Sequence, residues 1–83
     1  MSCLRDVIEV VARALADEPQ AVTVSETPQG AGSLIEVFVS PGDVGKLIGR
    51  QGRTVAALRT VLAATAERHG MKATLEVRDR PAR

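Results

Sequence analysis

The sequence has few of the residues that form covalent cross-links, metal sites or aromatic surfaces. Its 83 residues include one cysteine, Cys3, one histidine, His69, and one aromatic residue, Phe38. A single cysteine excludes an internal disulfide and fits a reducing cytoplasm. One histidine and one distant cysteine provide neither a cluster of metal ligands nor a nucleophile–base pair, so we expect no metal site, no cofactor and no enzymatic activity.

Long apolar runs are also absent from the sequence. No run approaches the roughly 20 residues that cross a bilayer, and the N-terminus lacks the basic segment and apolar core of a signal peptide. We therefore expect a cytoplasmic protein with no membrane partner. A chain of 83 residues has room for one domain, so we expect a single domain over 1–83, with 79–83 as a flexible tail.

The formal net charge of +1 conceals a strong asymmetry. Residues 1–43 carry two basic and seven acidic side chains, a balance of −5, and residues 44–83 carry nine basic and three acidic side chains, a balance of +6. This split suggests one surface that attracts a polyanion and another that avoids it. For the arginines near the C-terminus, an ordinary solvated surface is the simpler interpretation.

The most informative segment is rich in glycine and basic residues and spans 42–54. Glycine costs about 1 kcal/mol inside a helix, so its repetition here indicates that something must approach the backbone closely. The sequence Gly49-Arg50-Gln51-Gly52 lies between an apolar pair and a helix-like run, which predicts helix, tight turn, helix. The second helix would begin near Arg53, where free N–H groups and positive charge suit a phosphate.

Residues 44–55, Val-Gly-Lys-Leu-Ile-Gly-Arg-Gln-Gly-Arg-Thr-Val, resemble the signature of the KH domain, an RNA-binding module with an I-G-x-x-G-x-x-[IV] core. The whole chain, including residues 19–24, is similar to the small bacterial single-KH proteins of the KhpA type. In KH domains the GxxG loop clamps the backbone of about four nucleotides. The resemblance implies that these residues bind single-stranded RNA: Lys46, Ile48, Gly49, Arg50, Gln51, Gly52, Arg53 and Thr54.

The resemblance also implies a biological role and partners. Similar proteins act as RNA chaperones or post-transcriptional regulators, with a suggested link to the cell envelope or cell shape, as homodimers or with a second KH-containing protein. Stacking on aromatic side chains contributes about 1–3 kcal/mol per base, but Phe38 is expected to face away from the groove. We therefore expect weak, mainly electrostatic binding. Val44, Leu47 or Ile48 could line the groove, although some of them must serve the core, and single-stranded DNA stays open as a ligand.

Hydrophobic periodicity predicts the order helix, strand, strand, helix, helix, strand. The first helix should run from a cap at Ser2 to about Asp17, and the strands should span 21–26, 34–40 and 72–78, with a loop over 27–32. The side of the first helix that faces the core would carry Leu4, Val7, Ile8, Val11 and Leu15. The first two strands should form an antiparallel hairpin, and the third should pair in parallel after a helical crossover. The predicted fold class is α+β, a three-stranded mixed sheet that carries three helices on one face. The resemblance to KH domains implies the same arrangement, that of a type II KH-like domain.

The two later helices have recognisable ends. Asp43 is a suitable N-cap for the short helix before the loop, and Gly70 should end the long helix near His69. The core stripe of the long helix would be Val55, Leu58, Leu62 and Thr65. Its second stripe contains Ala57, Val61 and Ala64, for which the edge of the core is the default interpretation and a dimer contact is the alternative.

Two other functions compete with RNA binding. The first is a protein-interaction module that works through a partner KH protein with little RNA binding of its own, for which the acidic first half and the second stripe would matter most. The other is nucleotide hydrolysis, because Lys46 follows Gly45 as in a P-loop. However, Leu47 stands where that motif requires Ser or Thr, and Ser40 stands in place of its first glycine. Hydrolysis therefore has no support in the sequence.

Overall fold

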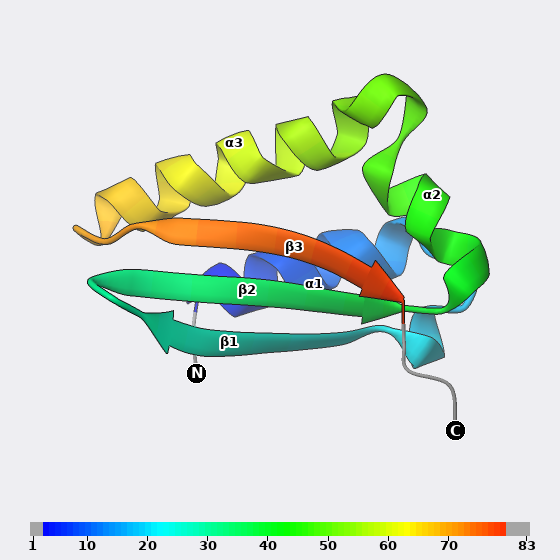
Figure 1. Cartoon of the computed structure of the whole chain (residues 1–83), viewed down its shortest axis with the longest axis horizontal. Coiled ribbons are helices and arrows are strands. Elements are labelled where there is room, and N and C mark those ends of the chain that lie inside the picture. The colour runs from blue at the N-terminus through cyan, green and yellow to red at the C-terminus, as the bar shows by residue number, and fades with distance from the viewer. Residues whose placement is uncertain (1–2, 80–83) are drawn as a thin grey trace.

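The computed structural model describes residues 3–79, and its helices and strands follow the predicted order (Figure 1). Single turns of 3₁₀-helix precede β1 and α2 and form the loop between α2 and α3. The helices and strands are α1 (Cys3–Leu15), β1 (Thr23–Gln29), β2 (Gly32–Val39), α2 (Val44–Ile48), α3 (Arg53–Arg68) and β3 (Ala73–Asp79).

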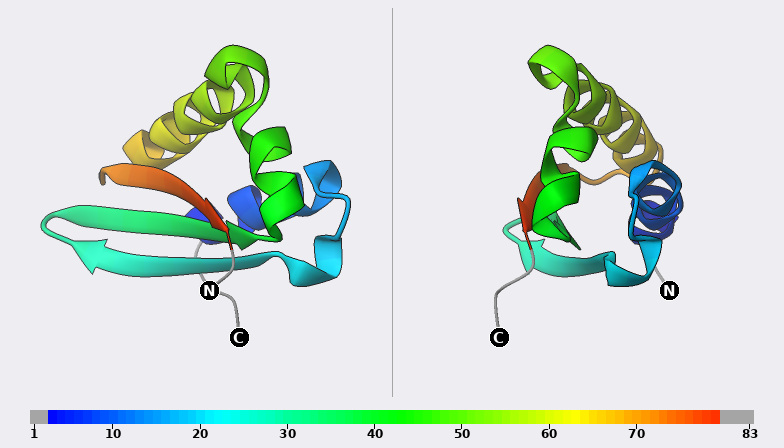
Figure 2. Two further views of the ribbon diagram at one scale, coloured as in Figure 1. Left: turned by 45° about the vertical axis from the view of Figure 1, so that its right-hand side comes forward. Right: turned by 90° about the vertical axis from the view of Figure 1, so that its right-hand side faces the viewer.

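The sheet has the strand order β1-β2-β3. β1 and β2 pair antiparallel with Val24 opposite Val37, and β2 and β3 pair in parallel with Ile35 opposite Leu75. The helices lie on one side of the sheet and leave its other face open (Figure 2). The predicted α+β fold with a mixed three-stranded sheet is therefore confirmed, and β3 is an edge strand.

The core lies between this sheet and the helices, and it corrects three residues of the predicted stripes. Val7 of α1 is only half-buried and lies outside the core. On α1, Ala12 is buried, whereas Leu15 is 38% exposed because it is the last residue of the helix, where neighbouring elements no longer cover it. On α3, Ala66 is buried in place of Thr65, whose hydroxyl donates to the carbonyl of Val61 at 2.9 Å. In the sheet, Ile35, Val37 and Val39 of β2 and Leu75 of β3 are buried, whereas Ala73 and Val77 of β3 are only partly buried.

Several element ends also differ from the prediction. α1 ends two residues early, and the hairpin extends beyond 26 so that only residues 30 and 31 form the turn in place of the predicted loop. Gly32 is needed there because a Cβ would collide with the carbonyl of Lys72. β3 continues through Asp79, where we predicted the tail to begin. The predicted cap Ser2 and the rest of the tail, 80–83, lie outside the described residues.

The end of α3 agrees with the prediction. Gly70 has φ +69°, its N–H donates to Glu67 at 3.0 Å, and the N–H of Met71 donates to Ala66 at 3.0 Å. These two bonds form a Schellman motif, which turns the chain from α3 into β3. Within residues 3–79 no helix has both the length and the apolar character to cross a membrane.

Candidate nucleic-acid interface

The loop between α2 and α3 is a tight turn with an unusual backbone. Positive φ values occur at Gly49 (79°), Gln51 (58°) and Gly52 (73°). The N–H of Gly49 donates to Gly45 at 2.8 Å and ends α2, and the N–H of Gly52 donates to Gly49 at 3.1 Å and closes the turn. Because left-handed backbone is uncommon outside glycine, this shape depends on Gly49 and Gly52 and places Gln51 in a strained conformation.

The two glycines of the loop are required for different reasons. A Cβ at Gly49 would collide with the side chain of Thr54 and lie 2.8 Å from its backbone nitrogen, whereas a Cβ at Gly52 would meet open space. Gly49 therefore serves both backbone conformation and close packing on α3, and Gly52 serves backbone conformation alone. Thr54, predicted to contact RNA, is half-buried and holds the loop against its own helix.

Positive charge collects where α3 begins. The side chains of Arg50, Gln51 and Arg53 are exposed, and Ile48 beside them is 38% exposed. α3 has no acidic residue in its first turn and no side-chain cap at Gly52. Its first N–H groups and the positive end of its dipole therefore face the loop. Neither arginine has an ion-pair partner within residues 3–79.

The side chain of Lys46 points away from the loop, toward Asp17. Its ammonium lies 3.3 Å from a carboxylate oxygen of Asp17, just after α1, in an exposed ion pair. Exposed pairs of this kind contribute little to stability, so Lys46 can exchange this partner for another anion. The structure therefore brings seven of the eight predicted RNA-binding residues together at the loop and places Lys46 one turn away, toward the end of α1.

Asp43 does not cap α2 as predicted. It is 3% exposed and makes no side-chain cap bond to that helix. Its carboxylate instead accepts the backbone N–H groups of Asp17 and Glu18 and the hydroxyl of Ser40, each at 3.1 Å. Burial by itself raises the pKa of Asp43, but these hydrogen bonds and the charge of Lys46 hold the pKa below its ordinary value of 3.8.

The aliphatic residues considered as a groove floor have separate roles. Leu47 is fully buried in the core, Val44 packs partly against it, and Ile48 is the one that remains exposed beside the loop. Phe38 lies on the sheet face opposite Val37 and Val39, as predicted, and is half-buried. No aromatic side chain is therefore available at the loop.

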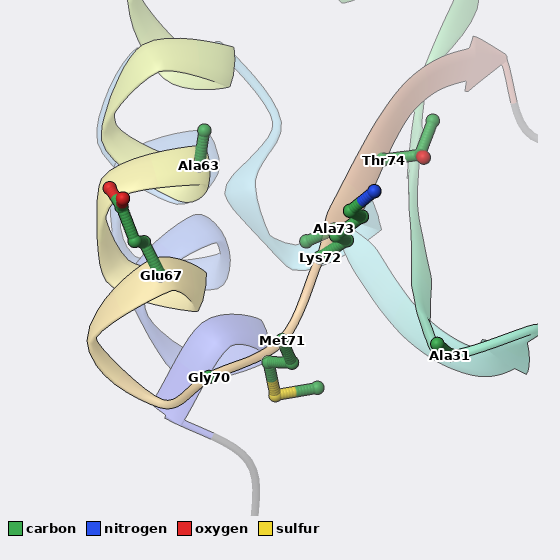
Figure 3. Close-up of a pocket in the computed structure, with 8 residues that line it drawn as sticks. All are labelled: Ala31, Ala63, Glu67, Gly70, Met71, Lys72, Ala73 and Thr74. Atoms are coloured by element: carbon green, nitrogen blue, oxygen red, sulfur yellow. The ribbon is translucent and has the colours of Figure 1, made fainter.

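A cavity lies between α3 and β3, at the end of the helix away from the loop. Its volume is about 750 Å³, and it lies between the last turns of α3 and the start of β3, with Ala63 and Glu67 on one side and Lys72 and Thr74 on the other (Figure 3). Between the loop and this cavity, the Arg59 guanidinium donates to the carbonyl of Leu75 at 3.3 Å. The sequence predictions missed Arg59, because its significance depends on which strand faces that side of α3.

The second stripe of α3 lies on the surface. Ala57, Val61 and Ala64 are all exposed, and Val61 is 47% exposed. The default interpretation as the edge of the core is therefore wrong. No described element covers these residues, which leaves the dimer contact as a prediction.

Comparisons with known proteins agree with this geometry. The family model described as KhpA/KhpB, KH domain, matches residues 5–77. The chain is 40% identical over 77 residues to the RNA-binding protein KhpA of Aquifex aeolicus, covering 93% of this chain and 98% of that protein. It is 42% identical over 76 residues to KhpA of Halalkalibacterium halodurans, covering 92% of this chain and all of the relative.

The fold also occurs in a larger protein of known structure. Era, crystallised in complex with MgGDPNP and nucleotides 1506–1542 of 16S ribosomal RNA, matches with a TM-score of 0.61 at 20% identity. The match covers 94% of this chain but only 30% of Era. At this identity the likeness supports the fold alone.

Proposed function

Because this chain belongs to the KhpA/KhpB family of KH domains, a family of RNA-binding proteins and not of enzymes, we propose that it binds single-stranded RNA with the loop between α2 and α3. The observation that carries this proposal is the conformation of residues 49–52, which exposes backbone and basic side chains at the uncapped start of α3. The single domain over 1–83 is the binding unit.

Phosphates bind at the loop in this proposal. The first N–H groups of α3 and the side chains of Arg50 and Arg53 hold them, Gln51 adds a hydrogen-bonding group, and Ile48 offers an apolar surface beside the turn. Gly49 and Gly52 keep the backbone accessible, Thr54 positions Gly49, and Lys46 lies close enough to add charge. In this proposal the bases then lie along the side of α3 that faces β3. Since no aromatic side chain lies at the loop, binding depends mainly on phosphate contacts and weakens with salt.

The biological role that we propose is that of a cytoplasmic RNA chaperone or post-transcriptional regulator, with a link to cell shape. Because one weak site holds RNA poorly, we propose that the protein works as a pair of KH domains. The exposed stripe of Ala57, Val61 and Ala64 is the surface that we propose for a homodimer or a second KH-containing protein. Two linked sites gain affinity through effective concentration. If the chain worked only through its partner, this stripe would matter and the loop would not.

The direct test is fluorescence anisotropy with a short labelled single-stranded RNA at low and moderate salt. We compare wild type with the double variant Arg50→Asp/Gln51→Asp. The matched control is Arg68→Asp/Gln29→Asp, which changes net charge equally at two exposed positions on α3 and the hairpin, neither of which forms an ion pair within residues 3–79. We expect the loop variant to lose salt-sensitive binding while its circular dichroism stays unchanged, and we expect the control to bind nearly as well as wild type.

Equal binding by the loop variant and wild type would exclude the loop. No binding by wild type well above ~100 μM, where even non-specific contacts register, would favour the interaction module. A DNA strand of the same sequence shows whether the 2′-hydroxyl contributes to binding.

A further inference from the structure

Arg59 connects α3 with the free edge of β3. Its Nη2 lies 3.3 Å from the carbonyl oxygen of Leu75, and the residue is exposed. Within residues 3–79, β3 pairs with one strand only, β2. The guanidinium therefore bridges α3 and the edge of β3, at a position on α3 between the loop and the cavity near Ala63.

The surroundings of Arg59 keep its guanidinium accessible. Its neighbours along the same side of α3 are Ala56 and Ala63, three residues before and four residues after it, and neither has a side chain that could cover it. The only aromatic residue, Phe38, lies on the other face of the sheet. The guanidinium is therefore a planar group at the surface between α3 and β3, and it donates a hydrogen bond to the Leu75 carbonyl.

The charges near the two ends of α3 differ. Arg50 and Arg53 are at the loop with no ion pair in the described residues, whereas at the far cavity the charge of Glu67 offsets that of Lys72. The loop end is therefore the better site for phosphate. Arg59 lies six residues after Arg53 on the same helix, between this end and the cavity.

We propose that Arg59 is a base-contacting residue, whose guanidinium plane stacks against one base of the strand held by the loop. This inference rests on the proposed function. Bases stack on arginine guanidinium planes as they do on aromatic rings, and lysine cannot replace arginine there because an ammonium has no plane. Since larger bases stack more strongly, Arg59 should favour purines over pyrimidines.

The test compares Arg59→Lys with wild type for labelled oligo(A) and oligo(U) RNA of eight nucleotides. The variant keeps the charge but loses the plane. We expect its affinity for oligo(A) to fall about five- to ten-fold, the scale of one lost stack, with a smaller loss for oligo(U) and an unchanged salt dependence. The control is Arg68→Lys, nine residues along the helix and therefore on its opposite side.

Equal affinity of Arg59→Lys and wild type for oligo(A) would overturn this inference. The loop variant Arg50→Asp/Gln51→Asp, measured beside it, separates the two proposals: if it loses binding and Arg59→Lys does not, the loop is the site and Arg59 is not a contact. If the loop variant binds like wild type, the proposed function itself fails. A second measurement needs no variant: the Arg59 Nε–H resonance of wild type should shift on saturation with oligo(A), and an unmoved resonance would also overturn the inference.

Discussion

The two ends of α2 are built from opposite charges and differ in how those charges are used. At its start, the Asp43 carboxylate is buried and accepts three hydrogen bonds from the protein. At its other end, Arg50 and Arg53 are exposed without an ion pair in the described residues. A charge satisfied within the fold has a structural role, and an exposed group of charges on a strained turn is available for a ligand. The start of α2 is therefore structural, and the loop at its end is the candidate site.

The largest effect should come from Asp43→Ala. The N–H groups of Asp17 and Glu18 and the hydroxyl of Ser40 would lose their acceptor, and partly buried donors left without a partner are costly. With three donors affected, we expect the melting temperature to fall by roughly 20 degrees in thermal unfolding. The control is Asp17→Ala, which removes the same charge from an exposed ion pair and should change the melting temperature little. If Asp43→Ala instead kept the wild-type melting temperature and bound RNA more weakly, the start of α2 would have a binding role.

Acid should weaken the same contacts. The pKa of Asp43 is lowered in the folded protein, so its contribution to stability is present above the unfolded value of 3.8 and is lost as pH falls through the folded pKa. We expect the stability difference between wild type and Asp43→Asn, measured by urea unfolding, to shrink as pH is lowered from 6 to about 2.5. A difference that stays constant over this range would show that the carboxylate charge is irrelevant there.

The two loop glycines should differ when each is replaced by alanine. Gly49→Ala introduces a clash with Thr54 in addition to an unfavourable φ, so we expect a loss of about 2–3 kcal/mol in the free energy of unfolding, more than at Gly52. Gly52→Ala faces open space and should cost about 1–2 kcal/mol for the left-handed backbone alone. Denaturant unfolding measures both. Equal losses would mean that the loop moves away from Thr54 and is less rigid than the structure indicates.

The smallest effect on stability should come from Gly45→Ala, between the two ends. A Cβ at Gly45 would meet nothing within 4 Å, and the residue lies within α2 without a positive φ. Alanine should therefore stabilise the free protein by about 0.4–1 kcal/mol. If RNA approaches this part of α2, as its missing side chain suggests, affinity should fall although stability rises. Unchanged affinity would place Gly45 outside the interface.

The sequence was sufficient to predict the order of the elements and the position of the loop, because both depend on local patterns. Alternating valines predict a strand, and Gly49 and Gly52 around two polar residues predict a turn. The burial of Ala12 in place of Leu15 could not be predicted in the same way. Periodicity identifies the side of a helix that faces the core, but not where along the helix the covering elements end.

The missed contacts join distant parts of the chain. Asp43 follows Pro-Gly before a short helix, which is the local pattern of an N-cap, yet its acceptor oxygens serve amides 25 and 26 residues earlier. Arg59 resembles an ordinary surface arginine until the parallel pairing of β2 and β3 places Leu75 beside it. Such contacts are set by the topology of the sheet, which local sequence does not encode.

The close packing of Gly49 on Thr54 has a kinetic consequence. A loop already fixed against its own helix loses little conformational entropy when a ligand arrives. Association then needs no folding step and is limited mainly by diffusion and charge, so dissociation determines the lifetime of each complex. If RNA binds at this loop as proposed, a contact that forms quickly and lacks aromatic stacking there also releases quickly.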